Sequence, residues 1–189
     1  TWTLSLWAKR ANLGSEQSLF NAWQNDNSRL SFNWNTSDKL TMYEQTSGNV
    51  TWEFSSDAVY RDASAWHHIV LVRDAANGVA ADRTKVYVNG SLADLTQTTT
   101  LSDVDGIVNQ SILHSMGREN HSNSPASYLD AYIAETHFID GQAIGPENFA
   151  LTDSNGVYNP IRYTGTYGTN GFYLPFEASD IGADKSGNG

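Results

Sequence analysis

Hydrophobic and polar residues alternate along much of this chain, in short runs with the two-residue period of β-strands. The first run, T-W-T-L-S-L-W-A-K at residues 1–9, places Trp2, Leu4 and Leu6 on one face. Further runs are bounded by turn-forming residues and lie at 18–23, 30–34, 40–42, 50–54, 111–117 and 171–176. This pattern predicts about ten short strands with almost no helix, and therefore an all-β fold.

Two segments in the middle of the chain predict a central strand and a tight hairpin. Residues 66–74, W-H-H-I-V-L-V-R-D, are mostly apolar on both faces, which is typical of a strand that is packed on both sides. His67 and His68 face opposite sides of such a strand, so they cannot hold one metal ion together. Asn89-Gly90 lies between two strand halves of residues 85–92 and predicts a type I′ turn, because both turn positions need a positive φ.

Residues 128–149 predict a long strand followed by one turn of helix. Apolar and polar residues alternate from Leu129 to Ile139, as in a strand covered on one side. Asp140-Gly141 ends this strand, and Pro146 stands where a short helix can begin without losing a hydrogen bond. The polar residues at 96–109, 118–127 and 153–170 are expected to form connections.

Composition narrows the possible partners. The chain of 189 residues suits a single domain spanning residues 1–189. It has 11 Lys and Arg against 21 Asp and Glu, a formal charge of −10, which argues against nucleic acid and against an anionic membrane as partners. The absence of cysteine excludes disulfides and thiol chemistry. Because the chain starts at Thr1 and ends in S-G-N-G, we expect it to be a fragment of a longer protein.

Six motifs, standing in order, resemble known protein families. W-H-H-I-V-L-V-R-D (66–74), K-V-Y-V-N-G (85–90) and Y-L-D-A-Y-I-A-E-T-H-F-I-D-G-Q-A-I (128–144) together resemble the laminin G/pentraxin-like branch of the concanavalin A-like proteins. F-I-D-G-Q-A-I-G-P-E-N-F (138–149), Y-T-G-T-Y-G-T-N-G-F-Y-L (163–174) and D-K-S-G-N-G (184–189) are similar to domains of tailed-phage virion proteins of the marine and cyanobacterial type. The resemblance implies a two-sheet antiparallel β-sandwich, a jelly roll of the concanavalin A-like and laminin G-like kind.

The resemblance implies a non-catalytic function. We expect a binding or adhesion module at the surface of a phage virion, on a tail fibre or a similar protein, that contacts host surface glycan. The alternative is a structural capsid-decoration or tail-assembly domain whose partners are other virion proteins. In either case the parent protein is expected to be a homo-oligomer, with neither nucleic acid nor membrane as a partner.

Candidate binding residues lie in the polar segment 118–125, because loops at the rim of a sandwich often carry recognition. This segment offers Arg118, Glu119, Asn120, His121 and Asn123 as ligand-binding residues. Its alternative interpretation is a solvated connector. For glycan stacking, residue type also suggests Trp23, Trp34, Trp52 and Tyr43, although the phase of Trp34 and Trp52 favours core packing.

Candidate metal ligands are few. Asp184 and Asn188 in D-K-S-G-N-G could hold Ca²⁺, which prefers oxygen ligands, although the same residues also suit an ordinary turn. A weaker transition-metal set is His114, Glu119 and His121.

No catalytic residues are proposed. Hydrolysis of a glycosidic bond needs two carboxylates that flank it. Asp130 and Glu135 lie an odd number of residues apart on one predicted strand, so they should face opposite sides of it.

Overall fold

The protein is all-β in a computed structural model that describes residues 1–99, 103, 106–121 and 124–188. Two six-stranded sheets dominate, with strand orders β16-β13-β1-β6-β7-β8 and β10-β2-β3-β4-β5-β9. The strands of the first sheet are β1 Trp2–Arg10, β6 His67–Arg73, β7 Thr84–Val88, β8 Ser91–Leu92, β13 Ala131–Asp140 and β16 Phe172–Leu174. Those of the second are β2 Gln17–Asn25, β3 Ser28–Trp34, β4 Leu40–Thr46, β5 Asn49–Ser56, β9 Leu95–Gln97 and β10 Leu113–Met116.

Two small hairpins and two 3-10 turns complete the described structure. The hairpins pair β11 Glu119–His121 with β12 Ser124–Ala126, and β14 Ala150–Thr152 with β15 Tyr158–Pro160. The 3-10 turns are η1 Ala80–Asp82 and η2 Pro146–Asn148. No helix in the described part of the chain is long and apolar enough to cross a membrane.

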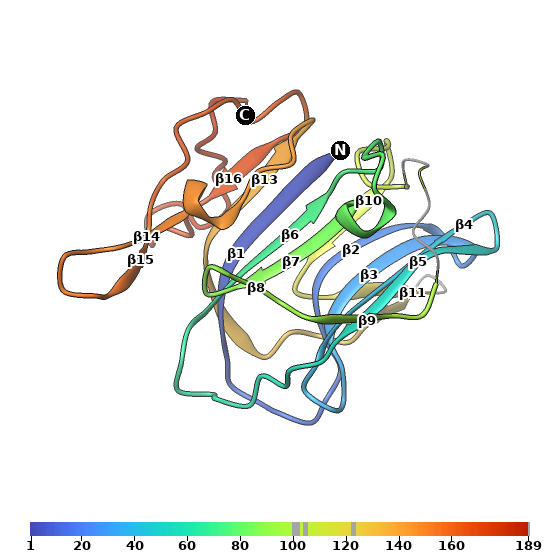
Figure 1. The fold of residues 1–189 in the computed structure, drawn as a ribbon, viewed down its shortest axis with the longest axis horizontal. Coiled ribbons are helices and arrows are strands. Elements are labelled where there is room, and N and C mark those ends of the chain that lie inside the picture. The colour runs from blue at the N-terminus through green and yellow to red at the C-terminus, as the bar shows by residue number, and fades with distance from the viewer. Residues whose placement is uncertain (100–102, 104–105, 122–123, 189) are drawn as a thin grey trace. The chain divides into compact units, whose positions relative to one another are not determined.

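The chain divides into two compact units, each built around one sheet. Unit 1 comprises residues 1–9, 65–92 and 132–189, and unit 2 comprises residues 10–64 and 93–131. The chain passes repeatedly between them, so each unit is assembled from segments that are distant in sequence. Figure 1 shows this for unit 1, where the first strand β1 lies between β13 and β6.

In unit 1 the predicted central strand and hairpin are confirmed. All seven residues of β6 are buried, and β6 lies between β1 and β7 in the sheet. Asn89 and Gly90 have φ values of 50° and 82°, the positive pair that a type I′ turn requires. β16 lies at the edge of the sheet. Pro175 follows it directly, and its missing N–H does not interrupt the hydrogen bonds between strands.

The long strand near residue 130 differs from its prediction in its first residue and in its regularity. β13 begins at Ala131, so Asp130 does not belong to it. Within β13, Glu135 has a φ of 48°, a left-handed conformation that breaks the regular alternation of side chains. The expectation that Asp130 and Glu135 occupy opposite faces of one regular strand is therefore wrong in its premise. The turn at Gly141 (φ 82°) and the helical turn beginning at Pro146 are confirmed.

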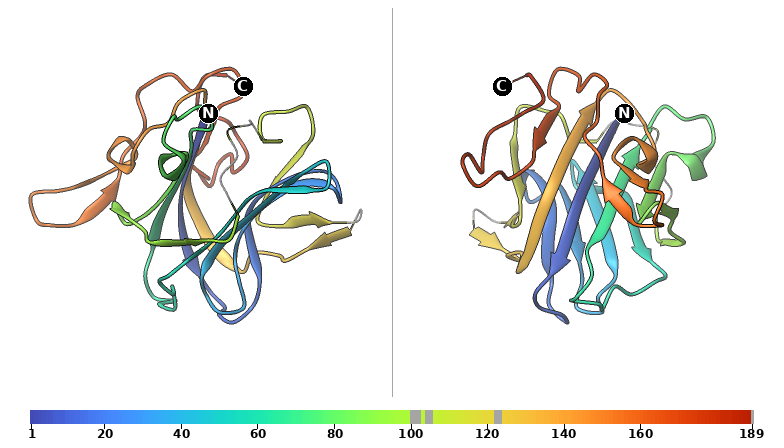
Figure 2. Two further views of the ribbon diagram at one scale, coloured as in Figure 1. Left: turned by 45° about the vertical axis from the view of Figure 1, so that its right-hand side comes forward. Right: turned by 90° about the vertical axis from the view of Figure 1, so that its left-hand side faces the viewer.

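Three segments predicted as polar connections contain short strands. β9 Leu95–Gln97 overlaps the start of 96–109 and extends the second sheet. β11 and β12 form a hairpin within 118–127, and β15 lies within 153–170, where the β14–β15 hairpin projects from the rest of unit 1 (Figures 1 and 2). Strands of three residues are too short to show a hydrophobic period, which is why the sequence pattern did not reveal them.

Two buried histidines anchor the C-terminal segment of unit 1 to its sheet. His68 has contacts from both ring nitrogens, Nε2 with Ser5 Oγ at 2.8 Å and Nδ1 with the Tyr158 hydroxyl at 2.9 Å. His137 stacks on Tyr173 with ring centroids 4.3 Å apart. Burial lowers the pKa of His68 to about 4 and that of His137 to about 3. Both rings are therefore neutral at neutral pH.

The depressed pKa values predict a loss of stability in mild acid. Because the folded pKa lies below the ordinary value of about 6.5, the stabilisation is complete above that pH and is lost as the pH falls towards the folded pKa. Between about pH 7 and about pH 5.5, urea unfolding should show a loss of up to about 1.4 kcal/mol per histidine. His137→Phe, which cannot be protonated, should remove the share of this pH dependence that comes from His137, while His68 and His114, whose pKa values burial also lowers, keep theirs. An unchanged pH dependence in the variant would contradict the assignment.

Candidate functional site

The second sheet, in unit 2, separates apolar from polar side chains on its two faces. On β3, Leu30, Phe32 and Trp34 are fully buried on one face. Their neighbours in sequence point to the other face, because successive side chains of a strand alternate. The polar face therefore carries the following residues of β3, β4 and β5: Arg29, Ser31, Asn33, Thr41, Tyr43, Glu53 and Ser55.

Strand register brings these polar side chains into one patch. Tyr43 on β4 lies opposite Ser31 on β3 and opposite Glu53 on β5. Side chains directly opposite each other in an antiparallel pair have Cβ atoms about 4.5–5.5 Å apart. Tyr43 is therefore the centre of a row that crosses three strands.

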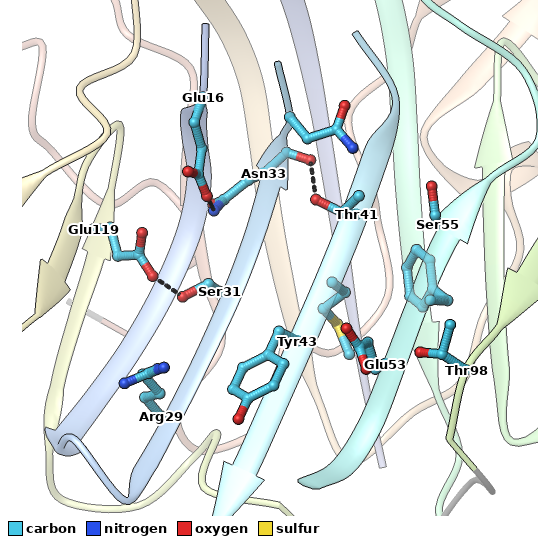
Figure 3. A pocket seen from close by; sticks show the side chains of 13 residues that line it. Glu16, Arg29, Ser31, Asn33, Thr41, Tyr43, Glu53, Ser55, Thr98 and Glu119 are labelled. Atoms are coloured by element: carbon cyan, nitrogen blue, oxygen red, sulfur yellow. Dashed lines mark hydrogen bonds between the residues drawn. The ribbon is translucent and has the colours of Figure 1, made fainter. Parts of the chain in front are cut away.

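The polar face is hollowed around this row, with a volume of about 370 Å³. Figure 3 shows Arg29, Tyr43 and Glu53 near one end of the hollow, with Glu16 and Asn33 at the other. The volume falls within the range of about 300–1,000 Å³ that is usual for sites of small molecules. The complete lining is Glu16, Arg29, Ser31, Asn33, Asn35, Thr41, Met42, Tyr43, Glu53, Phe54, Ser55, Thr98 and Glu119.

Tyr43 offers an aromatic surface with a fixed orientation. Its ring is partly exposed, its hydroxyl donates to Gln45 Oε1 at 3.0 Å, and the guanidinium of Arg29 lies 5.3 Å from the ring centroid. Arg29 Nη1 also donates to the carbonyl of Asp26 at 3.0 Å. These contacts hold the ring and the cation side by side, so a ligand would meet a largely preformed surface.

The three carboxylates of the hollow differ in their surroundings. Glu16 Oε1 accepts a hydrogen bond from Asn33 Nδ2 at 3.0 Å, and Glu119 accepts hydrogen bonds from Ser31 and from Ser127. Glu53 is partly buried beside Tyr43. With Arg29 as the basic lining residue, the hollow carries an excess of negative formal charge.

The predicted binding segment 118–123 contributes to this hollow through one residue. Glu119 lines it, whereas Arg118 and His121 are not among its lining residues, and Asn123 lies outside the described residues. In the described part of this segment, β11 pairs with β12, so the predicted polar loop contains a hairpin.

Asn120 has a structural position rather than an open one. It is 7% exposed, its backbone N–H donates to Asn21 Oδ1 at 3.0 Å, and its side-chain amide donates to Ser115 Oγ. Asn21 in turn donates to the carbonyl of Leu30 at 2.8 Å. This network fastens β11 to the polar face and so places Glu119 beside Ser31.

The tryptophans suggested by residue type fall into two groups. Trp34 and Trp52 are fully buried, which confirms the core packing that their phase favoured. Trp23 is partly buried at the end of β2 and does not line the hollow. Tyr43 is the member of this set that the structure places in the hollow.

Arg29, Asn33 and Glu53 were not identified from sequence, although the alternation that buries Leu30 and Phe32 could have indicated them.

The two proposed calcium ligands take part in hydrogen bonds of the C-terminal segment. Asp184 accepts hydrogen bonds from the backbone N–H of Tyr173 at 2.9 Å and of Ser186 at 2.8 Å, and Asn188 Nδ2 donates to the carbonyls of Gly168 and Gly171. These bonds close the C-terminal segment onto unit 1. Within the described residues, no three His, Cys, Asp or Glu side chains lie close enough together to hold a metal ion. His114, Glu119 and His121 therefore do not form a metal site in this structure.

Calcium binding at Asp184 and Asn188 stays a prediction with a direct test. If Ca²⁺ bound there, calcium would raise the unfolding temperature relative to an EDTA-treated sample. The increase should be lost in Asp184→Asn, which keeps the side-chain size and removes the charge. An unfolding temperature that is the same with calcium and with EDTA would exclude the site.

Comparison with protein families establishes the class of the chain. Residues 1–148 match the family described as the concanavalin A-like lectin/glucanases superfamily. The chain belongs to this superfamily, and the predicted all-β sandwich class is confirmed. A search of curated protein sequences finds no match to the chain.

Solved structures with a similar fold include domains of bacterial sialidases. The CBM40 domain of Ruminococcus gnavus IT-sialidase, bound to α2,6-sialyllactose, matches with a TM-score of 0.55 at 14% identity over 77% of this chain and 79% of that one. The same domain bound to α2,3-sialyllactose matches with a TM-score of 0.52 at 15% identity over 70% and 72% of the two chains. The K499G mutant of NanB sialidase from Streptococcus pneumoniae matches with a TM-score of 0.59 at 18% identity, over 80% of this chain and 25% of that one. At these identities the likeness shows the fold alone.

The Asn120 network makes a prediction about the edge of the site. Asn120→Ala removes the side-chain donor to Ser115 Oγ but keeps the backbone N–H bond to Asn21, and should lower the free energy of unfolding by about 1 kcal/mol, measured by urea denaturation. His121→Ala, a change of the exposed next residue, should alter it by no more than about 0.5 kcal/mol. Equal effects of the two substitutions would contradict the anchoring role of Asn120.

Proposed function

We propose that this domain is a non-catalytic glycan-binding module and that the glycan lies on the polar face of β3, β4 and β5, over Tyr43. The observation that carries the proposal is the hollow of about 370 Å³ with a partly exposed tyrosine ring at its centre. A sugar ring has an apolar face, which packs on an aromatic ring, and a rim of hydroxyls, which need both donors and acceptors.

The groups around Tyr43 supply both kinds of hydrogen-bonding partner. Thr41, Ser55 and Thr98 carry hydroxyls that donate and accept, and the carboxylate of Glu53 accepts. Thr41, Ser55 and Glu53 come from neighbouring strands of one sheet, which is a rigid support, and Thr98 directly follows β9 of the same sheet. Binding would therefore cost little ordering of the protein.

The carboxylates do not favour catalysis. Glycoside hydrolysis needs a carboxylic acid and a second carboxylate on either side of the scissile bond. Here Glu16 and Glu119 are engaged by Asn33 and by two serines, respectively, which suits positioning of the polar face. Incubation with the bound glycan should release no reducing sugar.

The charge of the hollow supports neutral glycans as ligands. A carboxylate on the ligand would gain from Arg29 but would be repelled by Glu16, Glu53 and Glu119. The sialyllactose in the CBM40 structures is the ligand of that protein, whereas this hollow favours uncharged sugars. The further assignment to a phage virion surface, with host glycan as the target, rests on the motifs at residues 138–149, 163–174 and 184–189.

A glycan array followed by calorimetry tests this proposal. The expected result is binding of neutral glycans, weakened by about tenfold or more in Tyr43→Ala, because the stacking surface is lost. Tyr43→Phe, which keeps the ring, should retain most of the affinity. Tyr132→Ala is the matched control, because Tyr132 is exposed on β13 and does not line the hollow.

A pair of ligands isolates the effect of charge. Each neutral glycan that binds should bind more tightly than its sialylated counterpart, and Glu53→Gln should narrow the difference by removing one repulsive charge. Tighter binding of the sialylated member would overturn the charge argument while leaving glycan binding intact. The absence of binding to every glycan would overturn the proposed function itself.

A further inference from the structure

A second hollow lies within unit 1 and is lined by a different chemistry. Its volume is about 360 Å³, and its walls include Trp7, Trp66 and Tyr158, with Glu135 and Asn159 as polar members. Trp66 is 40% exposed, a high value for so large an apolar side chain. All of these residues belong to the described part of unit 1.

The aromatic walls are held in place by contacts beneath them. Trp7 stacks on His68 with centroids 5.0 Å apart, and its ring centroid lies 5.6 Å from that of Tyr158. The Tyr158 hydroxyl is engaged by His68 Nδ1 at 2.9 Å. The two rings therefore form a wall whose position is set by the sheet rather than by a mobile loop.

The lining of this hollow carries negative charge, and none of its lining residues carries a balancing positive charge. Glu135 supplies a carboxylate, and no Lys or Arg lines the hollow. His68, which lies under Trp7 and Tyr158, is uncharged at neutral pH because burial lowers its pKa to about 4. The pKa of Tyr158 is raised by burial and further by the nearby charge of Glu147, a second carboxylate that adds to the negative potential.

Glu135 adopts an unusual backbone conformation in order to occupy this position. Its φ of 48° lies in the left-handed region. This conformation is energetically unfavourable for any residue other than glycine. One carboxylate oxygen, Oε2, accepts a hydrogen bond from the Tyr173 hydroxyl at 2.6 Å. This bond orients the carboxylate but does not neutralise it.

The remaining hydrogen-bonding capacity favours a ligand that donates. Both N–H groups of the Asn159 amide are directed to protein acceptors, Asp153 Oδ2 at 3.1 Å and the carbonyl of Val157 at 3.0 Å. The side-chain acceptors left for a ligand are the second oxygen of Glu135 and the carbonyl oxygen of Asn159, while the donors among the lining side chains are the indole N–H groups of Trp7 and Trp66. A sugar needs many donors as well, and an anion would be repelled.

We propose that this hollow binds an organic ammonium group, with the cation over the aromatic faces of Trp66 and its neighbours and paired with the carboxylate of Glu135. Such a cation is attracted both by the negative face of an aromatic ring and by a nearby carboxylate. The proposal is independent of glycan binding in unit 2, because the two sites share no residue.

Three small probes test the proposal on the whole domain by NMR titration of the tryptophan indole signals. Tetramethylammonium is the cation, tert-butanol is a neutral molecule of similar size, and n-butylammonium is a primary amine. We expect saturable shifts of the Trp66 signal with tetramethylammonium and at least about fivefold weaker binding of tert-butanol. The n-butylammonium arm shows whether a primary amine, as on a lysine side chain, serves as well as a methylated one.

Two variants and one control connect the binding to the site. Trp66→Ala and Glu135→Gln should each weaken tetramethylammonium binding by about fivefold or more. Trp66 is partly exposed, so its variant should fold even if Glu135→Gln disturbs the strand. Tyr43→Ala should bind the cation as the parent does. Equal affinity for the cation and tert-butanol, cation binding that persists in both variants, or no saturable shift would overturn the proposal.

Discussion

The alternation of side chains along β3, and its regular pairing with β4, is the constraint on which the candidate site depends. Trp34, Trp52 and Phe32 occupy one face and are buried, while Tyr43 and Glu53 occupy the other. A shift of one residue in the pairing of these strands would exchange the two faces and would bury charges in place of tryptophans. The energy that fixes the core therefore also fixes the part of the site on β3, β4 and β5, while the Asn120 network positions Glu119 at its edge.

Much of the fold can be predicted from local sequence patterns, whereas the candidate site can be predicted only in small part. The doubly packed strand β6 and the Asn89-Gly90 turn were predictable because both signals lie within a few adjacent residues. The hollow was not predictable from the sequence, because Glu16, Tyr43 and Glu119 come together only after strands from distant parts of the chain have paired. Of the predicted 118–125 segment, Glu119 lines the hollow, whereas Asn120 is buried and bonded to the sheet. Its role depends on Asn21, about one hundred residues away in sequence.

The two hollows illustrate how similar volumes can select different ligands. In unit 2, hydroxyls and carboxylates surround a single tyrosine, a mixture that suits the hydroxyls of a sugar. In unit 1, aromatic rings surround a single carboxylate, and the donors of Asn159 are already used, a mixture that suits a cation. His68, which lies against Trp7 and Tyr158, is neutral at neutral pH because burial lowers its pKa to about 4, so it adds no positive charge beside this hollow.

The central claim is that a neutral glycan lies over Tyr43 on the polar face of the second sheet. Its most direct test is an NMR titration of the labelled domain with a neutral glycan selected on the array, followed residue by residue. The account predicts the largest shifts at Tyr43, Glu53, Thr98 and their strand neighbours, with saturation and with no shift in Tyr43→Ala at the same concentrations. Shifts confined to Arg118 and His121, or to unit 1, would contradict it.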